Sequence, residues 1–206
     1  MARNKGFTLI EILLTAAALS MLLAVVYQVW FGIGDSARLL QSKAEASEDA
    51  VRAISRMARE LRQADRGSLT RLPANNLSYA IAEDRDGNGY AVDAQGRLEL
   101  SEPRRITRDH DDLNKDGLRE KQLVLVADGV VTVLANGLCP EEDKNQNGVL
   151  DPNEDANQNG RLDVGLRFEA AGEAIQLTVE TQRTTFKGFL LLGQARRLVL
   201  PRNNSQ

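Results

Sequence analysis

The sequence predicts an α+β fold in which one long amino-terminal helix is followed by a β-rich globular part with acidic loops. Three observations predict it. An apolar run without any charged residue extends from Ile12 to Ile33. Apolar residues recur at helical spacing over residues 35–65, and short strand-like apolar runs follow Gly67. The 206 residues leave room for one globular domain and an appended segment.

The charge of the chain is unevenly distributed. The formal net charge is -3, from 26 basic and 29 acidic residues. Between Cys139 and Asp163, however, there are seven acidic residues and two basic ones. A segment of this kind repels nucleic acid and attracts cations. We therefore expect no nucleic-acid partner.

Cysteine and histidine are each present once, as Cys139 and His110. A single cysteine cannot form an intrachain disulfide. A single histidine excludes a multi-histidine metal site and gives little support to a histidine-based catalytic dyad. We interpret His110 as a surface residue.

The apolar run is long enough to span a bilayer, which takes roughly 20 residues. Arg3 and Lys5 precede it. The positive-inside rule then places the amino-terminal end in the cytoplasm and everything after Gly34 outside, with a single pass through the membrane. The alternative is a secretory signal peptide cut at Ala16-Ala17-Ala18, which would leave an apolar segment at the new amino terminus.

Glu11 is an ionisable residue at the start of this apolar segment, where a carboxylate costs at least about 2.5 kcal/mol and is usually functional. The segment Lys5-Gly-Phe-Thr-Leu-Ile-Glu11 resembles the processing motif of type IV prepilins and pseudopilins. In that family a prepilin peptidase cuts after the glycine and methylates the new amino-terminal phenylalanine. The resemblance implies that Gly6 is the cleavage position and Phe7 the methylated first residue.

The same resemblance implies that Glu11 is an assembly residue, paired with the amino-terminal ammonium of a neighbouring subunit. Two opposite charges among packed apolar helices lower each other's desolvation cost, so the pairing selects the correct register between subunits. The partners implied are other pilins or pseudopilins, the prepilin peptidase and the inner membrane. The head would lie in the periplasm until the subunit enters a filament.

A pilin-like chain of this kind divides into four parts: a leader peptide at 1–6, a transmembrane helix at 7–33, an amphipathic helix at 34–65 and a β-rich head at 66–206. The amphipathic part carries one apolar stripe. Its members are Leu39, Leu40, Ala46, Ala50, Ile54, Met57, Ala58 and Leu61. Residues 56–63 are similar to the corresponding helix of the J-type minor pseudopilin of type II secretion and of W-type minor pilins.

The head is predicted to be mainly β, with strands over 77–82, 121–127, 130–135, 165–169 and 174–181. Two apolar runs flank Asp128-Gly129, which favours a tight hairpin because both residues tolerate positive φ. A second hairpin is predicted to turn at Ala171-Gly172-Glu173.

Four Asp/Asn/Gly segments lie between these strands. The template of a calcium loop alternates oxygen ligands, has a glycine at the sixth place and ends with a glutamate at the twelfth. One segment matches it fully, with Asp143, Asn145, Asn147, Gly148, Asp151 and Glu154. A second repeats the pattern but has Leu166 at the twelfth place, with Asp155, Asn157, Asn159, Gly160 and Asp163.

The other two segments match less completely. A shortened version contains Asp112, Asn114, Asp116, Gly117 and Glu120. A looser one contains Asp84, Asp86, Asn88, Gly89 and Asp93. The alternative interpretation is that all four are ordinary turns, since Asp, Asn and Gly populate turns without any ion.

Carboxylate and amide oxygens on flexible backbone favour Ca²⁺ over Mg²⁺ or Zn²⁺. The segments resemble EF-hand and thrombospondin-type calcium loops, although the flanking helices of an EF-hand are not predicted. Calcium would order the acidic stretch and stabilise the head by linkage. It would thereby take the place of the missing disulfide.

Three functions are compatible with these features. The leading hypothesis is a structural filament subunit, a minor pilin or pseudopilin at or near the tip that helps to start assembly. A second is a displayed or membrane-anchored calcium-binding recognition module, such as an adhesin. A third is a membrane-tethered hydrolase, but the sequence contains no G-x-S-x-G and no phosphate loop. We therefore expect no enzymatic activity.

Overall fold

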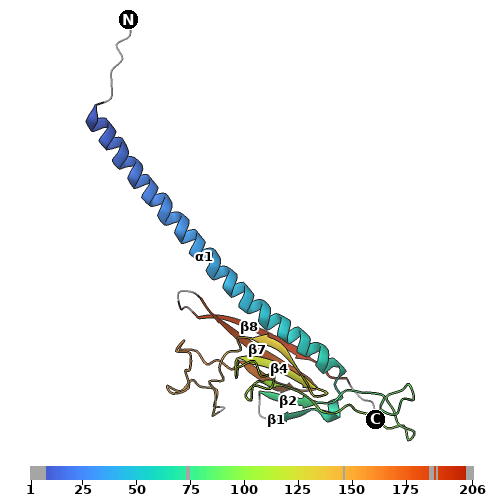
Figure 1. Ribbon diagram of the computed structural model, residues 1–206. Helices are drawn as coiled ribbons and strands as arrows, with labels where there is room; N and C mark the ends of the chain where they lie inside the picture. Colours follow the sequence, from blue (N-terminus) through green and yellow to red (C-terminus); the bar gives the residue numbers. More distant parts are fainter. Residues whose placement is uncertain (1–7, 73–74, 146, 186–187, 189, 203–206) are drawn as a thin grey trace. The chain divides into compact units, whose positions relative to one another are not determined.

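The structure, a computed structural model, describes residues 8–72, 75–145, 147–185, 188 and 190–202. Within them it has one long helix, a short 3-10 helix and eight strands (Figure 1). These are α1 (Leu9–Gln63), η1 (Arg66–Ser68), β1 (Thr70–Leu72), β2 (Asn76–Tyr79), β3 (Arg104–Arg108), β4 (Gln122–Ala127), β5 (Val130–Asn136), β6 (Leu166–Ala171), β7 (Ala174–Thr184) and β8 (Leu190–Val199). The predicted α+β fold is confirmed.

The chain divides into two compact units, Met1–Gln41 and Ser42–Gln206. In the first unit α1 is apolar and contains no proline, so nothing in the sequence interrupts its hydrogen bonds. One 18-residue window of α1 has a mean hydropathy of 2.5. Among the described residues, α1 is the one helix long and apolar enough to cross a membrane.

In the second unit, the end of α1 packs on the sheets through its apolar stripe. The predicted members Ala46, Ala50, Ile54, Met57, Ala58 and Leu61 are buried, together with Ala53. Leu39 and Leu40 were also predicted to belong to the stripe, and this was wrong. Both are exposed, and both precede Ser42, where the unit that contains the sheets begins.

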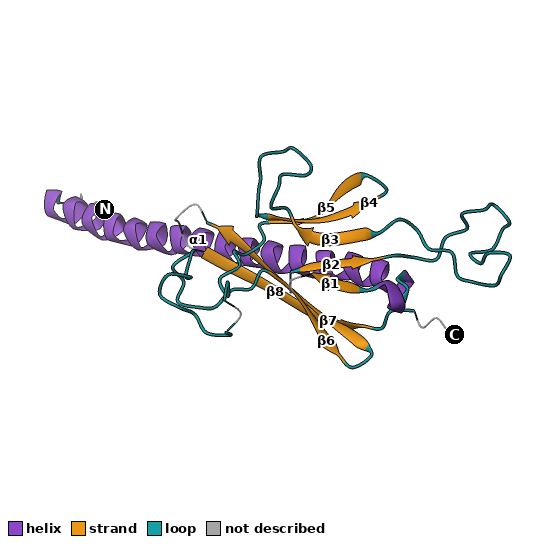
Figure 2. Cartoon of the chain, turned by 90° about the horizontal axis from the view of Figure 1, so that it is seen from below, coloured by secondary structure: helices purple, strands orange, loops and turns teal. Residues whose placement is uncertain are grey.

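Two antiparallel sheets form the rest of the second unit (Figure 2). One has the strand order β1-β2-β3-β4-β5 and the other the order β6-β7-β8. The five predicted strands correspond to β2, β4, β5, β6 and β7, with shifted ends. Strands β1, β3 and β8 were not predicted, because β3 and β8 carry arginines where an apolar alternation was sought, and β1 is only three residues long.

Both predicted hairpins are confirmed. Ala127 pairs with Val130 across the β4–β5 turn, and Asp128 and Gly129 have φ values of 52° and 74°. Positive φ at both central residues is the geometry that matches the twist of the flanking strands. Ala171 pairs with Ala174 across the β6–β7 turn, where Gly172 has a φ of 63°.

The core lies between α1 and the two sheets. Its largest fully buried apolar side chains are Met57, Leu61, Leu77, Tyr79, Ile106, Leu123, Leu138, Leu166, Phe168 and Leu177. Gly193 of β8 lies against the backbone of Ala46 and Ser47, so a Cβ at this position would collide with the helix. The hydroxyl of Thr181 donates to the carbonyl oxygen of Ala46 at 2.7 Å.

The acidic loops lie at two ends of this unit. The loop between β2 and β3 is at one end, and the long loop between β5 and β6 is at the other (Figures 1 and 2). The loop between β3 and β4 is tied to the start of the β5–β6 loop, because Arg108 donates to the carbonyl oxygen of Cys139 at 2.7 Å.

Candidate functional sites: the amino-terminal motif and the acidic loops

Glu11 closes the amino-terminal end of α1. Its Oε2 atom accepts hydrogen bonds from the backbone N–H of Thr8 at 2.9 Å and from the Thr8 hydroxyl at 3.0 Å. In return the N–H of Glu11 lies 3.4 Å from the Thr8 hydroxyl oxygen. This reciprocal arrangement is a capping box, which satisfies backbone groups that the first turn of a helix leaves open. The spacing Thr-x-x-Glu could have predicted it from the sequence.

The predicted processing residues Gly6 and Phe7 lie outside the described residues. The structure describes the chain from Thr8 onward, which is the residue after Phe7. The apolar stretch of α1 begins at Leu9.

The four acidic loops share one hydrogen-bond pattern. The carboxylate of the first residue of each loop accepts the N–H of the glycine five residues later, which has a positive φ. The pairs are Asp84–Gly89 at 2.8 Å, Asp112–Gly117 at 3.1 Å, Asp143–Gly148 at 3.2 Å and Asp155–Gly160 at 3.0 Å. The four glycine φ values lie between 69° and 88°. Glycine adopts this backbone at no steric cost, which explains the sixth place of the template.

The third and fifth residues of each loop repeat the pattern on a smaller scale. Each accepts the N–H of the residue two positions later. The third-place acceptors are Asp86, Asn114, Asn145 and Asn157, and the fifth-place acceptors are Asn88, Asp116, Asn147 and Asn159. The side chains at places one, three and five are thereby turned toward the inside of the same loop, as a calcium loop requires.

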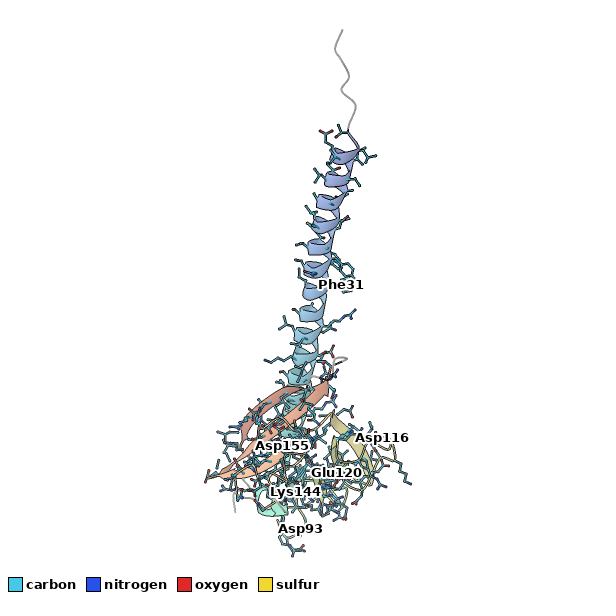
Figure 3. All side chains as sticks on the ribbon, turned by 90° about the vertical axis from the view of Figure 1, so that its left-hand side faces the viewer. Phe31, Asp93, Asp116, Glu120, Lys144 and Asp155 are labelled. Carbon is cyan, nitrogen blue, oxygen red and sulfur yellow. The ribbon has the colours of Figure 1, made fainter. Side chains whose placement is uncertain are left out.

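In the β2–β3 loop the ligand set differs from the predicted one. Carboxylate oxygens of Asp84, Asp86 and Glu99 lie within 4.8 Å of one another. Asp93 instead accepts the N–H groups of Gln95 and Arg97 and pairs with the Arg97 side chain at 2.8 Å. Figure 3 shows Asp93 apart from Asp116, Glu120 and Asp155. Glu99 was missed because it lies outside the twelve-residue template.

The Asp84 and Asp116 carboxylates have lowered pKa values. In Asp84 the main cause is the N–H of Gly89, and in Asp116 it is the N–H of Leu118. Backbone donors favour the ionised form of a carboxylate. The carboxylates of Asp84 and Asp116 therefore stay ionised to a lower pH than an ordinary aspartate does.

The β3–β4 loop brings Asp112, Asn114 and Asp116 together. The Asn114 amide donates to Asp116 Oδ2 at 3.0 Å, and the buried Gln122 amide donates to the same oxygen at 2.7 Å. The predicted fourth member, Glu120, lies differently. Its side chain is 68 % exposed, and its carboxylate is 3.7 Å from Nδ1 of His110.

The first of the two consecutive loops contains Asp143, Asn145, Asn147, Asp151 and Glu154. The amides of Asn145 and Asn147 both donate to Asp151 Oδ2, at 2.7 and 3.3 Å. Asp143 also accepts from Arg167 at 3.0 Å. Glu154 is 5 % exposed, and its Oε2 atom has no hydrogen-bond donor among the described residues.

The second consecutive loop is more deeply buried. The amides of Asn157 and Asn159 donate to Asp163 Oδ2, at 2.8 and 2.7 Å. Asp163 is 0 % exposed, and its Oδ1 atom has no hydrogen-bond donor in the described part of the chain. The nearest cationic group is Nε of Arg161, at 3.6 Å. Figure 3 labels Asp155, the first residue of this loop.

Glu142 holds the second loop, although the sequence analysis did not select it. Its side chain is fully buried and accepts the N–H groups of Asp163 at 3.0 Å and Asn157 at 3.3 Å. Burial raises the pKa of Glu142, and the negative charges of Asp163 and Asp155 also raise it. A cation in this loop would offset this repulsion.

Comparison with known proteins bears on the amino-terminal motif alone. Residues 1–27 match a family model described as the prokaryotic N-terminal methylation motif. No curated protein and no solved structure matches the chain. The match ends before residues 56–63, so it gives no support to the resemblance to J-type pseudopilins or W-type pilins. It supports a type IV pilin-like prepilin. The length and apolar composition of α1 are consistent with membrane anchoring.

Proposed function

We propose that this chain is a minor pilin or pseudopilin, made as an inner-membrane precursor and cut between Gly6 and Phe7 before it enters a filament. The observation that carries the proposal is the methylation motif at residues 1–27, which overlaps the start of α1, a helix able to span a membrane. The motif implies processing by a prepilin peptidase and assembly with other pilin subunits.

Glu11 is the residue through which neighbouring subunits would recognise one another. Both hydrogen bonds from Thr8 go to Oε2, which leaves Oε1 as a further acceptor. Cleavage after Gly6 creates a new ammonium group at Phe7. Pairing of that ammonium with Glu11 of the next subunit would remove the cost of a lone carboxylate among apolar helices.

The experiment that tests this proposal is to express the full chain with and without a prepilin peptidase and to determine the amino terminus by mass spectrometry. We expect a product that begins with methylated Phe7 only when the peptidase is present. An uncut chain, or a cut after Ala18, would contradict the proposal. The matched variant Gly6→Leu should stay uncut.

The C-terminal unit favours a minor subunit. It contains two sheets and several long loops, which suits a subunit present in few copies better than one repeated along a filament. We infer that it lies at or near the tip and helps to start assembly in a type II secretion or type IV pilus machine. Filament counts in cells that lack the chain test this: they should fall, while individual remaining filaments keep their ordinary structure.

We further propose that the acidic loops bind Ca²⁺ and that binding orders the C-terminal unit outside the cytoplasm. The support comes from buried carboxylates of the two consecutive loops. Among the described residues, Oε2 of Glu154 and Oδ1 of Asp163 accept no hydrogen bond, and Oδ1 of Asp163 lies 3.6 Å from Nε of Arg161. A buried carboxylate oxygen that accepts no hydrogen bond is costly unless something compensates it. A divalent cation with oxygen ligands does so.

The shared geometry of the loops also supports calcium. Places one, three and five of each loop are oriented inward, and the four glycines permit the required turn. In the β2–β3 loop, however, the acidic group of Asp84, Asp86 and Glu99 is exposed or only half-buried. The proposal therefore rests on the other loops.

Isothermal titration calorimetry of the full chain in detergent micelles tests calcium binding directly. We expect heat from CaCl₂ but not from MgCl₂ at the same concentration, and a rise in the unfolding temperature. At a calcium concentration about 100 times the Kd, linkage stabilises the folded state by about 2.7 kcal/mol per site. The absence of any difference between calcium and EGTA would contradict the proposal.

A further inference from the structure

The aromatic side chains of α1 are gathered in one short stretch of the helix. They are Tyr27, Trp30 and Phe31, which follow one another at the spacing of three and four residues that places side chains on one face. Tyr27 and Phe31 form a tilted ring pair with centroids 4.2 Å apart. All three residues are exposed, Trp30 most of all at 75 %, and Figure 3 shows Phe31 beside the helix. We call these three residues the aromatic face.

The polar side chains of α1 that precede the aromatic face are satisfied within the helix. The hydroxyl of Thr15 donates to the carbonyl oxygen of Glu11 at 2.9 Å, and that of Ser20 donates to the carbonyl oxygen of Ala16 at 2.8 Å. A polar group without a hydrogen bond is costly in hydrocarbon. Both hydroxyls can therefore lie inside a bilayer.

The polar groups at the aromatic face differ in this respect. The Tyr27 hydroxyl, the Gln28 amide and the Trp30 indole N–H make no hydrogen bond with any described residue. Hydrocarbon offers these groups no partner, whereas water and lipid headgroups do. Tyrosine and tryptophan combine such a polar group with an apolar ring, which is why both are enriched where a bilayer meets water. The stretch from Tyr27 to Phe31 has the composition of that boundary.

The distance from the aromatic face to Glu11 matches the thickness of a bilayer. Trp30 is 19 residues from Glu11, which is about 29 Å along a helix. The hydrocarbon core of a bilayer is about 30 Å thick. With Trp30 at one boundary, Glu11 therefore lies at the other, where its carboxylate can stay hydrated. Asp35, the next charged residue along the chain, then lies outside the hydrocarbon.

We infer that Tyr27, Trp30 and Phe31 anchor α1 in the outer headgroup region of a lipid bilayer and set the depth at which the helix is inserted. The inference rests on the proposed membrane anchoring of the precursor and deepens it. The hydrocarbon segment ends near Tyr27, so the last part of the predicted transmembrane helix, up to Ile33, lies among headgroups. Glu11 is then hydrated in the membrane and enters apolar surroundings only when the subunit joins a filament.

The test uses Trp30 as its own reporter, because the chain has one tryptophan. The full chain is placed in vesicles of phosphatidylcholine and phosphatidylglycerol whose acyl chains carry bromine either near the headgroup or near the chain end. We expect the shallow bromine to quench Trp30 fluorescence at least about twice as strongly as the deep bromine. The control is Trp30→Phe combined with Met21→Trp, which moves the tryptophan about 14 Å toward the bilayer centre and should reverse the order.

A second pair of variants tests whether the aromatic face sets the depth. Tyr27→Leu combined with Phe31→Leu keeps the helix apolar but removes the ring pair and the hydroxyl. The helix should then insert more deeply, and the ratio of shallow to deep quenching at Trp30 should fall by roughly half. Val25→Leu combined with Val29→Leu, exposed positions with the same spacing, is the matched control and should leave the ratio unchanged.

Three results would overturn the inference. Stronger quenching by the deep bromine places Trp30 in hydrocarbon, and weak quenching by both bromines shows that water or a second copy of the chain covers the aromatic face. An unchanged ratio in Tyr27→Leu with Phe31→Leu shows that the aromatic face does not set the depth. Cleavage at Gly6 is measured separately by mass spectrometry, so any of these results together with correct cleavage removes the anchor and leaves the proposed function in place.

Discussion

The guanidinium of Arg108 donates a hydrogen bond to the carbonyl oxygen of Cys139, with an Nη2–O distance of 2.7 Å. Through Nη1 it also donates to the carbonyl oxygen of Glu120 at 2.6 Å. Arg108 is 2 % exposed, and burial lowers the pKa of its guanidinium. One buried cation therefore joins the end of the β3–β4 loop to the start of the β5–β6 loop.

Arg108→Met should destabilise the C-terminal unit. Methionine fills part of the volume but leaves the carbonyl oxygens of Glu120 and Cys139 without this donor, at an expected cost of about 2–4 kcal/mol. Denaturant unfolding of the full chain in micelles, followed by circular dichroism, measures the change. Arg59→Met, at an exposed position of α1, is the control and should change stability by less than about 0.5 kcal/mol. Equal effects of the two substitutions on the free energy of unfolding would show that the hydrogen bonds of Arg108 do not stabilise the C-terminal unit.

Gly165→Ala should be destabilising at the same point of the fold. Gly165 has a φ of 61°, and a Cβ there would collide with Nη2 of Arg108 and the carbonyl oxygen of Cys139. Strain and displacement of the guanidinium together should cost about 2–4 kcal/mol. The effect should be less than additive with Arg108→Met, because part of the collision disappears with the guanidinium. Full additivity would contradict this link between the two residues.

Cys139 should be unreactive in the folded chain. It is 0 % exposed, and burial raises the pKa of its thiol, with Asp163 and Glu180 raising it further. A raised thiol pKa keeps the protonated form dominant as the pH increases through the usual range of a cysteine, so the reactive thiolate stays scarce. Labelling with a thiol reagent at pH 8 should be at least about a hundredfold slower than at a cysteine introduced at the exposed Val130.

Removal of calcium by EGTA should accelerate this labelling, because Cys139 lies directly before the acidic loops of residues 143–163. In the folded chain its N–H donates to the carbonyl oxygen of Glu180 at 2.9 Å. The Val130→Cys site, at the β4–β5 turn, should keep its rate. If EGTA changes neither rate, the loops do not depend on calcium for their order.

The parts of the fold that the sequence predicted well are those that depend on local patterns. The apolar run of α1, the turn at Asp128-Gly129 and the glycines of the four loops each have a local cause, since spacing or positive φ specifies them. Strand β3 was missed because Arg104, Arg105 and Arg108 obscure its alternation. Their positions are explained only by distant partners, such as Cys139 for Arg108 and Glu60 for Arg104.

The same distinction applies to the candidate sites. The loop residues at places one, three and five follow a sequence template, and the structure places them together. Glu99 and Glu142 lie outside the template and approach the loops only through the fold. Glu120 and Asp93 fit the sequence pattern, but local turns direct them to His110 and Arg97. A sequence template therefore finds the loop but not the residues that close it.

Arg183 links β7 to α1 within the C-terminal unit, and its contribution should be small. It donates to Glu45 at 2.6 Å and to Asp49 at 2.8 Å, and the Asp49 hydrogen bond raises the pKa of its guanidinium. The side chain is 44 % exposed, so solvent screens both pairs. A double-mutant cycle of Arg183→Ala and Asp49→Ala should give a coupling of about 0.3–1 kcal/mol that decreases in 1 M NaCl. A coupling unaffected by salt would show that packing, and not charge, joins the two residues.

Glu154→Gln should separate the role of charge from the role of shape in the first consecutive loop. Glu154 is 5 % exposed and has one unpartnered oxygen, while its N–H donates to the carbonyl oxygen of Asp151 at 2.9 Å. Glutamine keeps the backbone bond and the size of the side chain but removes the negative charge and the bidentate carboxylate that a twelfth-place calcium ligand supplies. We expect the variant to fold in EGTA as stably as the unchanged chain and to lose about 1–3 kcal/mol of the stabilisation that CaCl₂ provides, since its site is no longer saturated.

Glu173→Gln, in the β6–β7 turn with a side chain that is 68 % exposed, is the matched control and should keep the full calcium effect. Unfolding temperatures of the three chains in EGTA and CaCl₂ decide the matter: an unchanged calcium effect in Glu154→Gln would remove Glu154 from the site, whereas a loss in EGTA as large as that in CaCl₂ would assign it to the packing of the loop instead.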